Sequence, residues 1–284
     1  MSLTTPRIDA HLHLWDLDPE VYTWLRPESG DLYSSFPPER IEGALVDQHI
    51  DGVILVQAAD SPADTAYLLE VAAAHDWVAG VVGWVQLDDE SVAVGQLDAL
   101  ADAHVLRGIR HLVHDDPRAD FLRLPAVRAS LRSVAARGLT FDVPDAWPHH
   151  LDAAAELASD IDDLTVVIDH LAKPPTDWAA RQSWRRSLAA VAARPNTVAK
   201  FSGLRSAVAA GYSAATLLPL WNDALELFGP SRLMWGSDWP VSGRTYAEII
   251  EPILTLVVTL SDSERAAVLG GTAANVYGTL EVAR

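Results

Sequence analysis

The stretch Leu164-Thr165-Val166-Val167-Ile168-Asp169-His170 shows the pattern that decides the fold: an apolar run that ends in polar residues. A run of this length without alternation is typical of a strand buried on both faces of a parallel sheet. Similar runs occur along the whole chain, at Arg7–His11, Gly52–Gln57, Val78–Val85, Leu106–Leu112, Leu139–Val143, Thr197–Ser202 and Arg232–Ser237. The sequence therefore predicts eight buried parallel strands.

Segments rich in Ala, Leu, Glu and Arg separate these runs and have the spacing of helices. Pro62–His75 follows Ser61, a good N-cap with proline at the first helical position. Pro125–Arg137 is followed by Gly138, which suits a helix C-terminus. Each interval is long enough for one helical crossover. Strands and helices that alternate in this way predict an α/β protein, a single (β/α)8 TIM barrel formed by residues 1–284.

A doubly wound open sheet is the alternative architecture. It favours a glycine-rich fingerprint after the first strand, where this chain has His11-Leu12-His13. The longest connection, Leu14–Pro38, is rich in Trp, Pro and Gly and has the composition of a loop. It emerges at the face where barrels build their sites. We expect either a surface excursion or a lid over the pocket.

Charge and composition exclude several classes of function. Lys and Arg number 21 against 39 Asp and Glu, a net charge of −18, which argues against a broad basic face for nucleic acid or anionic membrane. The chain has no cysteine, which excludes disulfides, Cys-ligated zinc and a thiol nucleophile. The N-terminus lacks the apolar core of a signal peptide, and no apolar run is long enough to span a bilayer. We expect a soluble cytoplasmic protein that acts on a small molecule, and the sequence leaves its oligomeric state open.

Polar residues at the predicted strand ends are the candidates for chemistry. His11 and His13 end the first strand two residues apart, so both imidazoles point to the same side and can converge on one metal ion or one carbonyl group. Asp238 follows the last strand between Trp235 and Trp239, surroundings that can tune a general base. Each has an alternative interpretation without chemistry. His11 and His13 could simply be two polar residues at a strand end, and Asp238 could be a structural residue that accepts hydrogen bonds from loop amides.

Other strand ends carry basic residues. Arg110 and His111 end the fourth strand, Lys200 ends the seventh, and His170 ends the sixth. Arg110 could clamp a carboxylate or an oxyanion with its planar guanidinium. For Arg110 and Lys200, an ion pair inside the barrel and a substrate contact are equally compatible with the sequence. His114 stays unassigned near a strand-end loop.

Four stretches resemble the amidohydrolase superfamily: Ile8–His13, Val167–Pro174, Lys200–Leu204 and Leu233–Pro240. Within it, the chain resembles the branch of sugar-acid lactonases of the L-fuconolactonase and L-rhamnonolactonase type, together with 2-pyrone-4,6-dicarboxylate lactonase. The resemblance covers nearly the whole chain. It implies an amidohydrolase-type barrel and a hydrolase that opens a cyclic ester, most simply a sugar lactone.

The resemblance also implies roles for individual residues. Asp238 would take a proton from water, and His170, with His11 and His13, would polarise the lactone carbonyl and stabilise the oxyanion. The remaining contacts to the ring would come from two basic residues, Arg110 and His111, and from apolar walls at Trp15, Trp84 and Trp239.

The chain departs from the superfamily at two ligand positions. Binuclear members carry a carbamylated lysine on strand four, where this chain has Arg110, and many mononuclear members carry a histidine on strand five, which here ends with Asp142 and Val143. We therefore expect no cofactor to be required. The alternatives are a decarboxylase or hydratase that uses one divalent metal, zinc or manganese, held by His11, His13 and Asp238, and a catalytically silent barrel that binds a metabolite.

Overall fold

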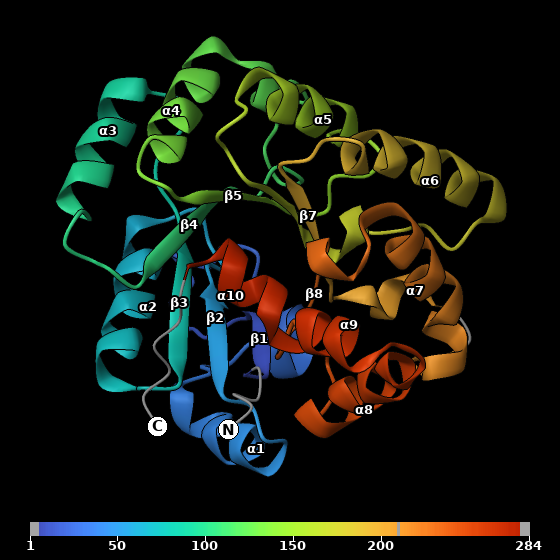
Figure 1. Cartoon of the computed structure of the whole chain (residues 1–284). Helices are drawn as coiled ribbons and strands as arrows, with labels where there is room; N and C mark the ends of the chain where they lie inside the picture. The colour runs from blue at the N-terminus through green and yellow to red at the C-terminus, as the bar shows by residue number, and fades with distance from the viewer. Residues whose placement is uncertain (1–5, 209–210, 279–284) are drawn as a thin grey trace.

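The computed structural model describes residues 6–208 and 211–278. Eight parallel strands form one sheet, each hydrogen-bonded to the next in chain order (Figure 1). The strands are β1 (Ile8–Leu12), β2 (Gly52–Val56), β3 (Val78–Gly83), β4 (Leu106–Arg110), β5 (Thr140–Val143), β6 (Val166–Ile168), β7 (Thr197–Phe201) and β8 (Leu233–Trp235). A parallel bridge between Leu12 and Trp239 brings the two edges together. The predicted (β/α)8 TIM barrel is confirmed.

Helices lie outside the strands and cover the barrel. They are α1 (Glu42–Asp47), α2 (Pro62–Ala74), α3 (Glu90–Ala99), α4 (Pro125–Ala135), α5 (Leu151–Asp160), α6 (Trp178–Ala192), α7 (Ala214–Phe228), α8 (Tyr246–Leu256), α9 (Asp262–Ala266) and α10 (Thr272–Val276). As predicted, the Ser61 hydroxyl caps α2 by accepting a hydrogen bond from the backbone N–H of Ala63. Gly138, beyond α4, has a φ of +68° that favours glycine.

Several predicted strands extend past the real ones by one or two residues. The sixth is the clearest case, because β6 ends at Ile168 and the chain turns sharply at Asp169. Residues near a strand end are as apolar as those inside it, so hydropathy alone places the boundary too late. Because the strands are shorter than predicted, several of the polar residues assigned to strand ends lie in turns at one face of the barrel.

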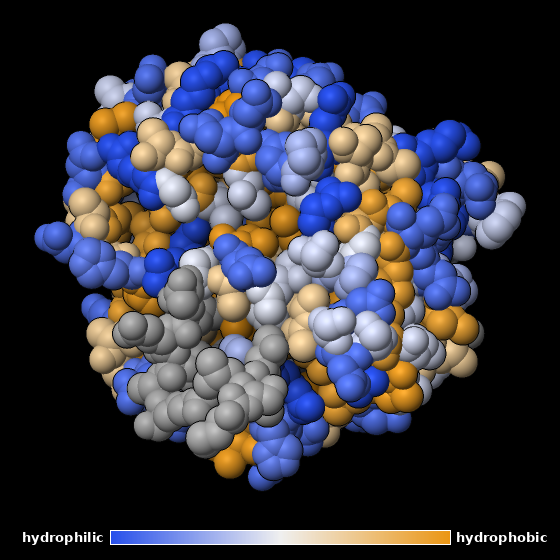
Figure 2. Space-filling model, viewed as in Figure 1, coloured by the Kyte–Doolittle hydropathy of each residue, from blue (hydrophilic) through white to orange (hydrophobic). Residues whose placement is uncertain are grey.

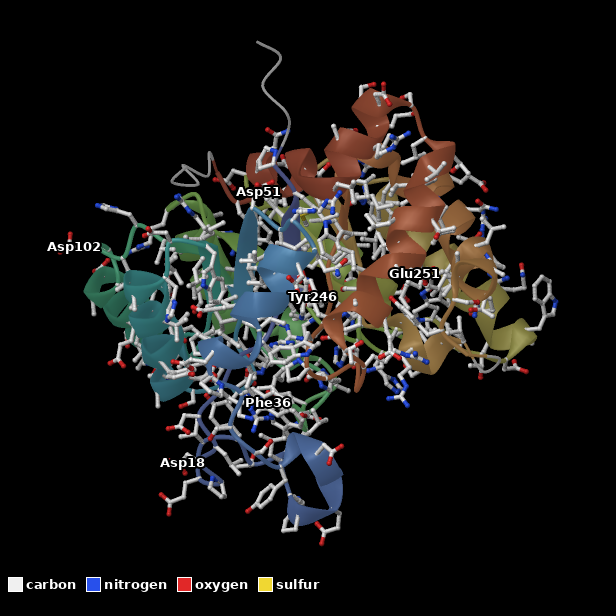
Figure 3. All side chains as sticks on the ribbon, turned by 90° about the horizontal axis from the view of Figure 1, so that it is seen from below. Asp18, Phe36, Asp51, Asp102, Tyr246 and Glu251 are labelled. Atoms are coloured by element: carbon white, nitrogen blue, oxygen red, sulfur yellow. The ribbon has the colours of Figure 1, made fainter. Side chains whose placement is uncertain are left out.

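The two ends of the barrel differ. At the amino ends of the strands, α10 crosses the opening (Figure 1), and the hydroxyl of Tyr277 reaches inside to donate to Asp142 at 2.9 Å. Hydrophilic residues predominate around the outline of this face (Figure 2). The Leu14–Pro38 loop lies at the opposite end, where Figure 3 shows Asp18 and Phe36 far from Asp51. The carboxyl ends of the strands are therefore the end left for a site.

Apolar side chains fill most of the barrel interior, which is packed rather than open. The inner cluster consists of Ile8, Ala10, Ile54, Val56, Val82, Val167, Val198, Met234, Ala273 and Tyr277. A larger cluster fills the space between the strands and the helices. Among the described residues, no helix has the length and apolar character needed to cross a membrane.

Candidate active site

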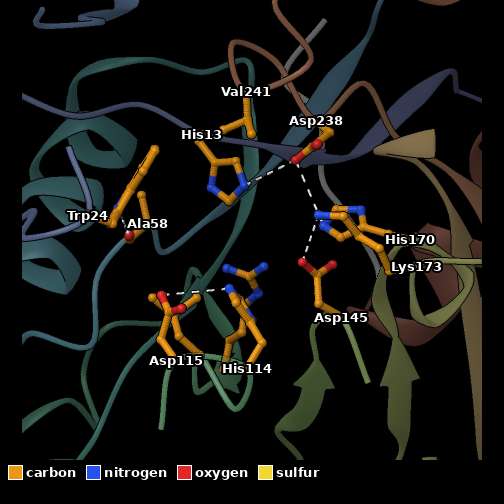
Figure 4. A pocket seen from close by; sticks show the side chains of 12 residues that line it. His13, Trp24, Ala58, His114, Asp115, Asp145, His170, Lys173, Asp238 and Val241 are labelled. Carbon is orange, nitrogen blue, oxygen red and sulfur yellow. Dashed lines mark hydrogen bonds and ion pairs between the residues drawn. The ribbon is translucent and has the colours of Figure 1, made fainter. Parts of the chain in front are cut away.

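A pocket opens at the carboxyl ends of the strands (Figure 4). It encloses about 610 Å³ of space outside the protein atoms, open solvent at its mouth included. The lining residues are His13, Trp24, Ala58, Arg110, Leu112, His114, Asp115, Asp145, His170, Lys173, Asp238 and Val241.

His11 lies in β1 and His13 just after its end, and their side chains meet as an extended chain predicts. Their Nε2 atoms lie 3.0 Å apart. The Nδ1 atom of His13 lies 2.8 Å from the carbonyl oxygen of Val56, which can only accept, so this nitrogen carries the hydrogen. The Nε2 atom of His13 consequently presents its lone pair to the pocket.

Asp238 completes the cluster from the loop after β8. Its Oδ1 atom lies 3.4 Å from Nε2 of His13, 3.7 Å from Nε2 of His11 and 3.9 Å from Nε2 of His170. The backbone N–H of Asp238 donates to the carbonyl of His11 at 2.8 Å, which fixes the loop to β1. The structure thus brings together four of the residues predicted from the sequence.

His170 begins a left-handed turn of four residues, His170–Lys173, with φ angles of 55°, 49°, 60° and 60°. Such a conformation costs an L-residue about 1–2 kcal/mol. The surrounding chain holds it in place: Trp184 donates its indole N–H to the carbonyl of Leu171 at 2.8 Å, and the N–H of Trp147 donates to the carbonyl of Ala172 at 3.1 Å. Backbone strain of this kind concentrates at functional sites.

Gly203 lets the chain after β7 approach the same cluster closely. Its φ is +59°, and a Cβ atom there would lie 2.5 Å from Nδ1 of His170 and 2.8 Å from Oδ2 of Asp238. Neither neighbour can give way without leaving the cluster. The hydroxyl of Ser202 lies 2.9 Å from Nδ1 of His170 and fixes the ring from this side.

Beneath the pocket, charged side chains pair inside the barrel. The ammonium of Lys200 lies 2.6 Å from Asp142, 3.1 Å from Asp169 and 3.3 Å from Nδ1 of His11. Arg110 donates its Nε hydrogen to Asp169 at 2.9 Å. Arg110 and Lys200 are therefore partners in buried ion pairs, and Asp142 turns inward to Lys200.

The electrostatics of this layer follow from burial and charge. Burial alone would raise the pKa of Asp169, but Lys200 and His11 hold it well below its usual value. Burial lowers the pKa of His13 and lowers that of His11 further. Both imidazoles are accordingly neutral at pH 7, the state in which histidine binds a metal.

The donor atoms of His11, His13 and Asp238 fit a single divalent cation. All of them lie within 4.8 Å of one another, and the pairs quoted above are separated by distances near the ~3.4 Å expected of ligands placed ~2.1 Å from a tetrahedral zinc ion. Three protein ligands leave one position open, as catalytic zinc sites do. His11 also belongs to a second group, with Asp169 and His170.

The structure places five predicted substrate-binding residues outside the pocket lining: His11, Trp15, Trp84, His111 and Trp239. His111 lies just past the end of β4, and its ring stacks on Phe121 with the ring centroids 4.0 Å apart. Trp84 donates its indole N–H to His111. Trp15 is fully buried, and Trp239 borders a neighbouring cleft. Their contacts with substrate stay predictions, since the pocket lining does not include these five residues.

Eight lining residues were not predicted as site residues: Trp24, Ala58, Leu112, His114, Asp115, Asp145, Lys173 and Val241. Trp24 comes from the Leu14–Pro38 loop and donates its indole N–H to the carbonyl of Ala58 at 2.7 Å. The loop is therefore a wall of the pocket rather than a remote excursion. Lys173 lies within Val167–Pro174, a stretch that resembles the superfamily, so the sequence already indicated that it could belong to the site.

Known proteins of similar sequence and structure share this arrangement of the chain. L-Fucono-1,5-lactonase of Burkholderia ambifaria is 34% identical over 84% of this chain and 81% of its own length. L-Fucono-1,5-lactonase of Burkholderia multivorans is 32% identical over 98% of this chain and 97% of its own. A crystal structure of a zinc-bound amidohydrolase from Burkholderia multivorans matches with a TM-score of 0.87 and 31% identity, over 96% of this chain and 99% of that one. The family model described as Amidohydrolase matches residues 8–279, and this chain belongs to that family.

Proposed function

We propose that this protein hydrolyses a lactone, most simply a sugar lactone, to the open-chain hydroxy acid. The observation that carries the proposal is the convergence of one carboxylate, Asp238, with three imidazoles at the base of a pocket. The two relatives named L-fucono-1,5-lactonase support the same reaction class.

Asp238 serves as the general base. Its Oδ1 atom takes a proton from a water molecule, and the oxygen of that water attacks the carbonyl carbon of the ring. His170 faces the oxyanion that forms. The Ser202 hydroxyl, 2.9 Å from Nδ1, fixes the ring, and a hydrogen on Nε2 is the one that His170 donates to the oxyanion. When the C–O bond of the ring breaks, Asp238 returns the proton to the leaving alkoxide.

His11, His13 and Asp238 are the residues that would hold a divalent cation. A bound cation polarises a carbonyl and lowers the pKa of a bound water. The carbonyl of Val56 orients the His13 ring for this task, and Asp169 lies 3.3 Å from Nδ1 of His11, in the place of the carboxylate that commonly supports a ligating histidine.

The charges of the pocket favour an uncharged substrate. Among the lining residues that the structure describes, Arg110 is already paired with Asp169 and Lys173 with Asp145. A dicarboxylate would need unpaired cations to replace its hydration. A neutral, hydroxylated lactone needs hydrogen-bonding partners instead, and the pocket offers such partners.

A screen with a pH indicator tests the proposal, because each lactone hydrolysed releases one acid. The panel should hold five- and six-membered aldonolactones beside pyrone lactones that carry carboxylates. We expect turnover of neutral aldonolactones and little turnover of the dicarboxylate. Absence of turnover across the panel, with ligand binding intact in calorimetry, would instead identify a catalytically silent barrel.

A metal-dependent decarboxylase or hydratase is the second candidate, favoured by the cation-sized spacing of His11, His13 and Asp238. Exhaustive chelation separates the two. We expect lactone hydrolysis to survive, because Asp238 and His170 supply the base and the oxyanion partner. A chelated protein that recovers lactone turnover only with stoichiometric zinc or manganese would contradict that expectation.

A further inference from the structure

An ion pair beside His170, in the wall of the pocket, has an unused acceptor. Asp145, in the loop after β5, accepts a hydrogen bond from Nζ of Lys173 through its Oδ2 atom at 2.7 Å (Figure 4). Its other oxygen, Oδ1, is buried and has no hydrogen-bond partner among the residues that the structure describes. A buried carboxylate oxygen without a partner is costly, and such atoms call for an explanation.

The surroundings of Asp145 keep this acceptor charged. Burial opposes ionisation, yet His170 and Lys173 together hold the pKa of the carboxyl below its usual value. The side chain of Lys173 is 45% exposed, so its ammonium has room for a second partner. A charged acceptor and a charged donor therefore stand side by side in the wall of the pocket.

The backbone holds this pair in one place. Asp145 and Lys173 both adopt left-handed conformations, with φ of 44° and 60°. Two bonds join their loops: the ion pair itself and the bond from the N–H of Trp147 to the carbonyl of Ala172. Strain of this kind persists only where the structure over-determines it and is typical of functional sites.

We propose that Asp145 and Lys173 form a subsite that recognises a ring hydroxyl of the substrate. The carboxylate of Asp145 accepts the hydroxyl hydrogen, and Nζ of Lys173 donates to the same hydroxyl oxygen or to the neighbouring one. The ligand class is a polyhydroxylated ring, so the pair selects a sugar lactone over an unsubstituted lactone. This inference rests on the proposed function, whose reaction takes place at Asp238.

Inert lactams test the subsite without turnover. Calorimetry would compare a polyhydroxylated δ-lactam with unsubstituted δ-lactam, in the wild type and in Asp145→Asn. In the variant the amide oxygen turns to Lys173 and the NH2 group takes the place of Oδ1, so an acceptor becomes a donor. We expect the wild type to prefer the hydroxylated lactam by roughly tenfold to hundredfold, as for a hydrogen bond to a charged group, and the variant to lose most of this preference.

Two further variants keep the test decisive. Glu156→Gln alters an exposed carboxylate that pairs with Arg123 and should leave both affinities unchanged. Lys173→Met removes the donor and should weaken only the hydroxylated ligand, which provides the test if Asp145→Asn does not fold. Equal losses for both lactams, or no loss, would show that the pair only clamps the two loops and would overturn the subsite.

Turnover distinguishes failure of the subsite from failure of the proposed function. Wild-type turnover of a hydroxylated δ-lactone measures the proposed function by itself, and the control Glu156→Gln should match its kcat within about threefold, well below the loss expected for a general base. A wild-type protein that shows the binding preference but hydrolyses no lactone would refute the function and leave the subsite standing. A wild-type protein that hydrolyses lactones without the binding preference would refute the subsite and leave the proposed function standing.

Discussion

The two walls of the pocket are built in different ways. The strand-end wall consists of Asp145, His170, Lys173 and Asp238, and every one of these residues has a left-handed backbone. The loop wall consists of Trp24 and Ala58, joined by one hydrogen bond from the indole to a carbonyl. Among the described residues of Leu14–Pro38, only Gly30 has a left-handed φ.

This difference indicates that the two walls have different roles. The strand-end wall carries the charged groups of Asp145, Lys173 and Asp238, and several backbone bonds fix it. The loop wall offers an apolar surface with a single indole contact. We infer that substitutions in the strand-end wall and in the ion pairs beneath it lower kcat or stability, whereas substitutions in the loop wall chiefly raise KM.

The largest effect is expected for Lys200→Met, beneath the strand-end wall. The change leaves Asp142 and Asp169 buried without their common cation, and breaking a buried pair in this way costs about 3–5 kcal/mol. Urea denaturation would measure the free energy of unfolding. Lys173→Met is the matched control, because that lysine is half-exposed and its loss should cost no more than about 1 kcal/mol. Equal losses in the two variants would contradict this account of the barrel interior.

His170→Ala tests the chemistry of the strand-end wall. Removing one partner of the oxyanion should lower kcat by about 10²–10³-fold, with KM nearly unchanged. Steady-state kinetics on the best aldonolactone would measure both constants. His104→Ala alters an exposed histidine away from the pocket and should behave as wild type. A rise in KM alone would move His170 from catalysis to binding.

Asp64→Asn probes how the loop wall is attached. Asp64 accepts hydrogen bonds from the hydroxyl of Tyr22 and the N–H of Ala58, and burial raises its pKa from 3.8 to about 7. Between these values the folded chain binds the extra proton, so the free energy of unfolding falls as pH rises, by up to ~1.4 kcal/mol per unit. Asparagine does not titrate and removes that contribution. Unfolding at pH 5.5 and 6.5 would measure it, and identical slopes in both proteins would refute the shift.

Trp24→Ala should have the smallest effect. The indole offers an apolar face to the ring of the substrate, so its loss should raise KM about threefold to tenfold and leave kcat nearly unchanged. Trp178→Ala is the control, because Trp178 is 75% exposed at the start of α6 and does not line the pocket. A large fall in kcat would mean that the loop wall takes part in the chemistry.

The sequence predicted the barrel and the cluster at Asp238 because both follow from short-range patterns. Buried strands reveal themselves by hydropathy, and His11 and His13 share a side by the alternation of an extended chain. Arg110 and His111 were predicted as neighbours in one strand, but β4 ends at Arg110 and leaves His111 in the following loop, a boundary that hydropathy does not give. Asp145 and Lys173 depend on left-handed turns, and Trp24 on the path of a long loop, neither of which hydropathy describes.

Asp238→Asn tests the central claim most directly. The substitution keeps the size of the side chain and removes the proton acceptor, so kcat on a sugar lactone should fall by about 10²–10⁴-fold. KM should change little, because Arg110, Asp145 and Lys173 remain in place. The free energy of unfolding should stay near the wild-type value. A folded variant with kcat within about threefold of wild type, well below the general-base range, would contradict the claim that Asp238 activates the water.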